Sequence, residues 1–286
     1  MEPNLLQILF LGLVQGAAEL LPVSSSAHVI VAEKLMGLDP SSPAMTFLLV
    51  MLHTGTMVAV IAYFWNAWKR TFFASAASLR ETAVNVFVAT VATLVVGLAL
   101  KVLIEKVFMH GTTKDEMEDL FGHLPLVGGA IFTAGVLILV AGHLRGSQGT
   151  RSLGILSSAW IGISQGFCLP FRGLSRSGTT ISVGMLQGIN RQRVEEFSFA
   201  LAVIITPPAV AKELMRLLKS HAEAASPHHL LHLIGPGLIG MIGAFVAGLL
   251  ALRLLSSWLE KGHWAWFGYY CVAFSGFVFF LASRGY

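Results

Sequence analysis

The first apolar segment of the chain contains the stretch Gln15-Gly-Ala-Ala-Glu19-Leu-Leu-Pro22-Val-Ser-Ser25-Ser-Ala-His28. A carboxylate, three serines and a histidine are costly to place in hydrocarbon, so a membrane segment carries such a cluster where it has a function. Pro22 ends the helix that approaches it and leaves two pieces, residues 5–21 and 27–37. Both are shorter than the roughly 20 residues that cross a bilayer. The stretch therefore predicts a re-entrant hairpin of two short helices.

The same pattern recurs 150 residues later in the chain. Gly162-Ile-Ser-Gln165-Gly166 echoes Gly12-Leu-Val-Gln15-Gly16, and Ser175-Arg176-Ser177 falls at the same offset from the first group of serines. Two short pieces, residues 153–169 and 178–188, flank a proline as before. Broken helices at matching places in two halves of a membrane chain are typical of inverted repeats with a binding site between them. We therefore predict a second hairpin that faces the first.

Composition places the whole chain in a membrane. Of its 286 residues 55% are hydrophobic and 12% are charged, and the mean hydropathy is +0.73. A soluble domain carries about 25% charged residues. The net charge of +4 is small and is explained by loops that orient the chain, so we expect no nucleic-acid partner. Two cysteines in apolar stretches imply no disulfide framework.

Six further stretches are apolar and long enough to span a bilayer, namely residues 44–65, 84–108, 126–143, 197–217, 230–255 and 264–283. The predicted fold class is all-α: a polytopic membrane protein with six transmembrane helices and two re-entrant helical hairpins in inverted-topology repeats. Residues 1–286 would form a single membrane domain. Its parts in chain order are the first hairpin (1–43), three transmembrane helices (44–152), the second hairpin (153–190) and three more transmembrane helices (191–286).

Loop charges orient this arrangement. Lys69, Arg70 and Arg80 follow the first span, so that loop is assigned to the cytoplasm, and the acidic segment 109–123 is assigned to the outside. The first hairpin then enters from the outer face and the second from the cytoplasmic face. Arg284, at a carboxyl terminus that this model places outside, is the one charge that argues against it.

The first hairpin carries groups that suit an anion and a cation. Gln15 and Glu19 are four residues apart, so they share a helix face and can converge on one ligand. One of Ser24, Ser25 and Ser26 is a natural N-cap of the second half-helix. A helix start offers free N–H groups and the positive end of the helix dipole, which favour an anion. Ser24 and Ser26 could equally be caps only.

The second hairpin adds cationic and hydroxyl groups. Arg172 and Arg176 lie among Ser175, Ser177 and Thr180. Guanidinium groups bind phosphate by two parallel hydrogen bonds, so two facing helix starts flanked by arginine predict a phosphate or diphosphate site. Arg172, nearer the break, could equally extend its side chain to the membrane interface. We assign His53, in the first span, to packing within the bundle.

These motifs resemble the undecaprenyl pyrophosphate phosphatase family, the bacitracin-resistance enzymes. The matching pieces are Gln15-x-x-x-Glu19, the run from Leu21 to His28, and Ser175-Arg176-Ser177-Gly178-x-Thr180. The similarity extends from the amino terminus to about residue 215. The chain departs from the family's pattern at Gln15, where glutamate is common, and in a second motif that is one residue longer and includes Arg172.

The resemblance implies a hydrolase that converts undecaprenyl diphosphate to undecaprenyl phosphate and inorganic phosphate, recycling the lipid carrier for peptidoglycan synthesis. It implies a divalent cation, Mg²⁺ or Ca²⁺, and a site on the outer side of the bacterial cytoplasmic membrane. We expect Glu19, helped by Gln15, to hold the cation, since hard cations bind oxygen ligands. Arg176 and its neighbouring hydroxyls would bind the diphosphate. Ser25 or a water would attack, with His28 transferring the proton.

A second function fits the same pattern. Inverted repeats with broken helices also build secondary transporters, so the chain could instead be a transporter or flippase of a lipid phosphate or another anion. We expect a polyprenyl diphosphate lipid and the membrane lipids as partners. The sequence leaves open whether two copies pair as a homodimer.

Overall fold

A computed structural model describes residues 3–39, 42–108, 123–144, 149–171, 173–220 and 227–285. In these residues the chain folds into ten helices, and six of them are long and apolar enough to cross a membrane. The six are α3 (Pro43–Thr71), α4 (Ala76–Phe108), α6 (Leu124–Leu144), α9 (Arg191–Ser220), α10 (Pro227–Glu260) and α11 (Trp264–Ser283). The predicted all-α class with six membrane-length helices is confirmed.

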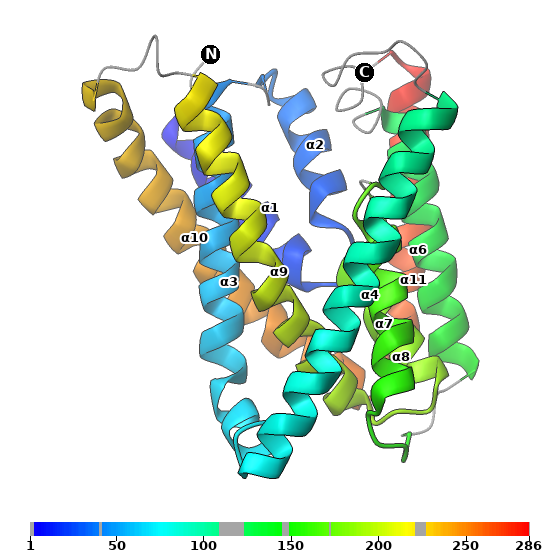
Figure 1. Cartoon of the computed structure of the whole chain (residues 1–286). Helices are drawn as coiled ribbons and strands as arrows, with labels where there is room; N and C mark the ends of the chain where they lie inside the picture. The colour runs from blue at the N-terminus through cyan, green and yellow to red at the C-terminus, as the bar shows by residue number, and fades with distance from the viewer. Residues whose placement is uncertain are drawn as a thin grey trace.

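The remaining helices form two hairpins. They are α1 (Leu5–Leu20) with α2 (Ser25–Leu35), and α7 (Ile155–Cys168) with α8 (Arg176–Leu186). The longest has 16 residues, about 24 Å at 1.5 Å per residue, against a hydrocarbon thickness of about 30 Å. Figure 1 shows α1 and α2 entering from the end that bears both termini and α7 and α8 entering from the opposite end. Their depth in a bilayer stays a prediction.

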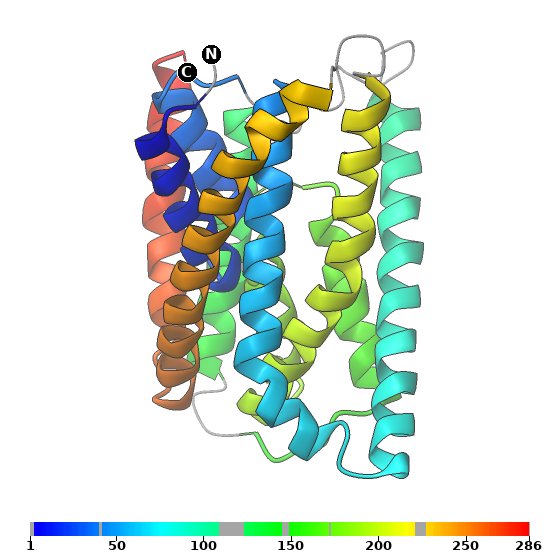
Figure 2. The ribbon, with the colours of Figure 1, turned by 90° about the vertical axis from the view of Figure 1, so that its left-hand side faces the viewer.

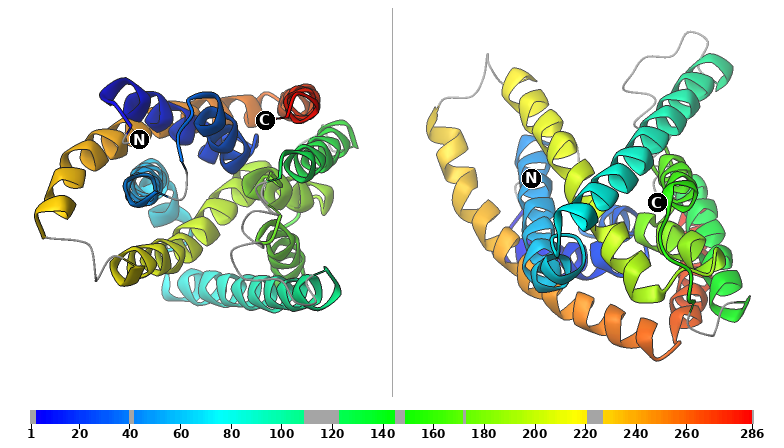
Figure 3. Two further views of the ribbon diagram at one scale, coloured as in Figure 1. Left: turned by 90° about the horizontal axis from the view of Figure 1, so that it is seen from above. Right: turned by 60° about the horizontal axis from the view of Figure 1, so that its bottom comes forward.

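The long helices surround the hairpins in a pattern that an inverted repeat requires. The first helix of each hairpin lies along a long helix of the other half, α1 along α10 and α7 along α4. Figure 2 shows α10 and α3 beside α1 on one side of the molecule. Seen from above in Figure 3, α6 and α11 lie side by side at one edge and α4 lies at another.

Small residues make these pairings close. A Cβ atom on Gly16 would lie 2.5 Å from the carbonyl oxygen of Ala244 in α10, and one on Gly162 would lie 2.2 Å from that of Ala89 in α4. Glycine at these positions lets the two backbones touch, as in small-xxx-small contacts between membrane helices. The repeated Gly-x-x-Gln-Gly motif therefore fixes where each hairpin tip lies in the bundle.

Candidate active site

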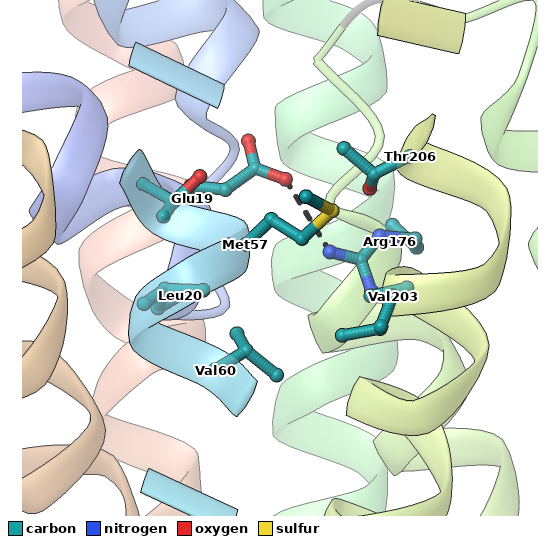
Figure 4. Close-up of a pocket in the computed structure, with 9 residues that line it drawn as sticks. Glu19, Leu20, Met57, Val60, Arg176, Val203 and Thr206 are labelled. Carbon is teal, nitrogen blue, oxygen red and sulfur yellow. Dashed lines mark hydrogen bonds and ion pairs between the residues drawn. The ribbon is translucent and has the colours of Figure 1, made fainter. Parts of the chain in front are cut away.

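The tips of the two hairpins are joined by an ion pair. Glu19, at the end of α1, places Oε1 3.3 Å from Nη2 of Arg176, the first residue of α8. The side chains are 18% and 19% exposed. Figure 4 shows the two groups pointing toward each other across the space between the hairpins. The structure thus brings together the carboxylate and the guanidinium that the sequence singled out.

The other oxygen of Glu19 receives two hydrogen bonds. The Ser25 hydroxyl donates to Glu19 Oε2 at 2.5 Å, and Gln15 Nε2 donates to the same oxygen at 3.2 Å. Ser25 is the first residue of α2, and Ser24 before it has a φ of +70°, a left-handed value that is costly for a residue with a Cβ. This strained backbone turns the start of α2 so that Ser25 meets Glu19.

One nitrogen of the Arg176 guanidinium is available to a ligand. Its Nη1 atom is buried and has no hydrogen-bond partner among the described residues. A buried donor without an acceptor costs roughly 1–3 kcal/mol, and more for a charged group, so the position favours an anionic ligand. A small pocket, with room for about one water molecule, lies beside it. The pocket is lined by Glu19, Leu20, Thr56, Met57, Val60, Arg176, Ala202, Val203 and Thr206.

His53 belongs to this site, which corrects the prediction that it only packs within the bundle. Its Nδ1 lies 2.8 Å from the carbonyl oxygen of Leu49, which only accepts, so Nδ1 carries the hydrogen. Nε2 then faces Glu19 Oε2 at 3.9 Å. Nothing local in the sequence signals this approach. It depends on how α3 packs against α10, where a Cβ on Gly55 would lie 2.3 Å from the carbonyl oxygen of Met241.

The predicted serine ligands mostly tie the two hairpin tips together. Ser26 Oγ accepts a hydrogen bond from the Gly173 amide at 3.3 Å and lies 3.4 Å from the Ser24 hydroxyl. Ser177 Oγ donates to the carbonyl oxygen of Leu21 at 3.4 Å. The contacts of Ser26 with Gly173 and of Ser177 with Leu21 cross from one half of the chain to the other, so they hold the tips in register.

Two further predicted ligands act on α8 itself. Ser175 is the N-cap of α8, and its hydroxyl accepts a hydrogen bond from the Gly178 amide at 3.2 Å. Thr180 is fully buried and donates to the Arg176 carbonyl oxygen at 2.8 Å, while its Oγ1 lies 2.6 Å from Ser198 Oγ on α9. Both hydroxyls therefore support the turn that carries Arg176. Arg172 lies outside the described residues.

His28 lies away from the ion pair. Its Nδ1 is 2.8 Å from the Ser24 carbonyl oxygen, and its Nε2 is 2.7 Å from the Tyr270 hydroxyl on α11. The ring also stacks on Phe274 at a centroid distance of 4.0 Å. Both nitrogens are engaged, so the predicted proton-transfer contact between His28 and Ser25 is not formed here. The physical reason is the aromatic wall of α11, which holds the ring.

Residues 8–277 match the family model described as bacitracin resistance protein BacA. The chain belongs to the BacA family. It is 54% identical over 282 residues to "Undecaprenyl-diphosphatase 2" of Acinetobacter baylyi, with 98% of each chain covered. It is 31% identical to proteins named "Undecaprenyl-diphosphatase" from Korarchaeum cryptofilum (93% of this chain and 95% of the relative) and Desulfosudis oleivorans (99% and 100%). The resemblance inferred from the hairpin motifs is confirmed, and this BacA-family chain is a multi-pass membrane protein.

The donors present in this BacA-family site limit how a metal ion could bind. Among the described residues no group of three His, Cys, Asp or Glu side chains is placed to hold a metal. Glu19 is the one carboxylate that lines the pocket. Mg²⁺ usually binds through one or two carboxylates together with substrate phosphates. The site therefore fits a cation shared with a phosphorylated ligand and does not fit a cation held by protein side chains alone.

Proposed function

We propose that this protein is a membrane phosphatase that removes the terminal phosphate of undecaprenyl diphosphate. The products are undecaprenyl phosphate and inorganic phosphate, and the reaction recycles the lipid carrier for peptidoglycan synthesis. The observation that carries the proposal is the Glu19–Arg176 pair between the hairpin tips, with the Ser25 hydroxyl on the same carboxylate. The names of the BacA-family relatives support the same activity.

Arg176 and the start of α2 bind the terminal phosphoryl group in this proposal. The unpartnered Nη1 of Arg176 donates to a phosphoryl oxygen and stabilises the charge that moves onto it during transfer. The first turn of α2 has no side-chain cap, so its N–H groups are open to an anion. Arg176 would thus hold Glu19 through Nη2 and the substrate through Nη1 at the same time.

Ser25 and Glu19 carry out the transfer. Glu19 Oε2 accepts the Ser25 proton, Ser25 Oγ forms a bond to the terminal phosphorus, and the bond from that phosphorus to the bridging oxygen breaks. Undecaprenyl phosphate leaves. A water then attacks the phosphoserine, gives one proton to Ser25 Oγ and leaves as part of inorganic phosphate, and Glu19 releases the proton it took. Direct attack by a water that Glu19 activates is the alternative, and it leaves no phosphate on Ser25.

A divalent cation, Mg²⁺ or Ca²⁺, completes the proposed site. Glu19 and the amide oxygen of Gln15 would be its protein ligands, and diphosphate oxygens would supply others. The cation supplies charge neutralisation of the phosphate oxygens. Gln15 already holds Glu19 by a hydrogen bond of 3.2 Å, which keeps the carboxylate turned toward the hairpin tip.

We place the enzyme in the bacterial cytoplasmic membrane with its active site toward the outer side. Lys69 and Arg70 lie in the last turn of α3, at the end of the molecule opposite the termini (Figure 1). Cationic loop ends favour the cytoplasm. The hairpin of α1 and α2, which enters from the other end, would then open to the outer face.

Phosphate release by purified protein in detergent tests the function. We expect metal-dependent release of inorganic phosphate from undecaprenyl diphosphate, whereas a transporter or flippase would bind the lipid without cleaving it. Binding of the lipid with no release of phosphate would contradict the proposal. Acid-stable phosphate on Ser25 after a rapid quench would distinguish serine attack from direct water attack.

A further inference from the structure

The pocket beside the ion pair has a polar end and an apolar wall. Glu19 and Arg176 form the polar end, and Thr56 and Thr206 add hydroxyl-bearing side chains. The other lining side chains are hydrocarbon or thioether groups: Leu20, Met57, Val60, Ala202 and Val203. The chemistry of this lining, charged at one end and apolar along the wall, matches a ligand with a charged head and an apolar tail.

Apart from Leu20 on α1, the apolar wall comes from α3 and α9, two helices with residues on the outer surface of the bundle. Met57 and Val203, on α3 and α9, are partly exposed. The residues that follow them, Val58 and Ile204, are each 44% exposed on the outer surface of the bundle. A chain that passes over Met57 and Val203 therefore moves from the pocket directly to the lipid-facing side of the protein.

Three other seams around the hairpins are closed by backbone contact. A Cβ on Gly16 or Gly162 would strike a backbone carbonyl of α10 or α4 at 2.5 Å or 2.2 Å, and one on Gly268 of α11 would lie 2.9 Å from the Gly135 oxygen of α6. Helices that touch at the backbone leave no room for a branched hydrocarbon chain between them. The α1–α10, α4–α7 and α6–α11 seams are thus excluded as routes.

The seam between α3 and α9 is fastened on one side of the pocket. Phe64 stacks on Phe199 at a centroid distance of 5.2 Å, and Trp68 and Thr71 donate to the backbone and side chain of Glu196. In the described residues, the ring contact and hydrogen bonds that join the two helices all lie on this side of the pocket, toward the end of the molecule opposite the termini (Figure 1). At the level of the pocket itself, Val60 of α3 and Val203 of α9 both line the seam.

We propose that the polyprenyl chain of the substrate leaves the active site between α3 and α9, across Met57, Val60 and Val203. This tail portal, defined by those three residues, rests on the proposed function and extends it. It makes the three side chains determinants of lipid selectivity. The diphosphate head binds at Arg176 whatever the tail, whereas a long prenyl chain fits only if the portal is open.

A matched pair of variants tests the portal. Val203→Phe fills it, and Ile204→Phe places the same ring one residue further along on the lipid-facing surface. We expect Val203→Phe to lower kcat/KM for undecaprenyl diphosphate by about tenfold or more, the scale of a steric mismatch in an apolar pocket. Its kcat/KM for dimethylallyl diphosphate, with a five-carbon tail, should change less than about twofold. Ile204→Phe should leave both unchanged. Equal losses for both lipids, or no loss for either, would overturn the portal.

Photolabelling decides the matter independently of turnover and of folding in the variants. The probe is a prenyl diphosphate with a diazirine in its second isoprene unit, incubated with the unmodified protein. The portal requires labelled peptides from both α3 and α9, and label confined to α4 and α7 or to α6 and α11 would overturn it. Unmodified protein that releases no phosphate from undecaprenyl diphosphate contradicts the proposed function, whereas release with the wrong selectivity or labelling contradicts the portal alone.

Discussion

Glu19 Oε1 lies 3.3 Å from Arg176 Nη2, although 157 positions separate the two residues in the chain. Each residue sits at the tip of a hairpin that enters from a different end of the molecule. An unpaired charge at either tip would have a large desolvation cost, so the pair is stable only when both hairpins are in place. The contact therefore couples folding of the two halves to assembly of the site.

Removing the Ser25 hydroxyl and removing the hydrogen-bond partner of His28 are expected to have different effects on turnover. Ser25→Ala removes the hydroxyl on Glu19 and should lower kcat by about a thousandfold or more if that hydroxyl attacks phosphorus. Tyr270→Phe removes the partner of His28 Nε2, an exposed hydrogen bond, and should cost about 1 kcal/mol of stability or less while leaving kcat within about threefold. Phosphate release and thermal unfolding in detergent measure both. A large loss of kcat in Tyr270→Phe at unchanged stability would show that His28 takes part in the reaction.

The left-handed backbone of Ser24 predicts an unusual ranking of two variants. Ser24→Ala and Ser24→Gly both lose the hydroxyl that lies 3.4 Å from Ser26 Oγ, but only glycine adopts a φ of +70° without strain. We expect Ser24→Gly to be more stable than Ser24→Ala by about 1 kcal/mol. The melting temperatures of the two purified variants check this, and equal values would show that Ser24 is not strained.

The close seam between α7 and α4 predicts a sharp difference between two glycine positions. A Cβ at Gly162 would lie 2.2 Å from the Ala89 carbonyl oxygen, whereas one at Gly129 in α6 meets nothing within 4 Å. Gly162→Ala should destabilise the protein by about 1–3 kcal/mol through overpacking. Gly129→Ala should be neutral or slightly stabilising, because alanine favours a helix interior. A Gly162→Ala variant with the same unfolding temperature as Gly129→Ala would contradict the packing.

Much of this fold can be predicted from local features of the sequence. The apolar stretches predict the six long helices because each is long enough to cross a bilayer. Pro22 and the repeated Gly-x-x-Gln-Gly motif predict two hairpins that face each other. The free-energy cost of a charge in hydrocarbon also singles out Glu19 and Arg176, since a lone acid and a lone guanidinium in apolar surroundings require a partner.

The site residues whose contacts the sequence did not predict are positioned by tertiary packing. His28 turns toward Tyr270, 242 positions away in the chain, and no local pattern connects the two. His53 reaches Glu19 because the rotation of α3 is set by its contact with α10 at Gly55. Thr180 meets Ser198 on another helix rather than the pocket. Side-chain direction on a buried helix is decided by its neighbours, and those are not readable from spacing alone.

Phosphate release by Glu19→Gln and Arg176→Lys, compared with the unmodified protein, tests the central claim most directly. Glu19→Gln keeps the size of the side chain and removes its charge, whereas Arg176→Lys keeps the charge and removes the two-pronged guanidinium. We predict that each lowers kcat/KM for undecaprenyl diphosphate by about a hundredfold or more while the protein remains folded. Turnover within about threefold of the unmodified protein in either folded variant would contradict a reaction centred on this pair.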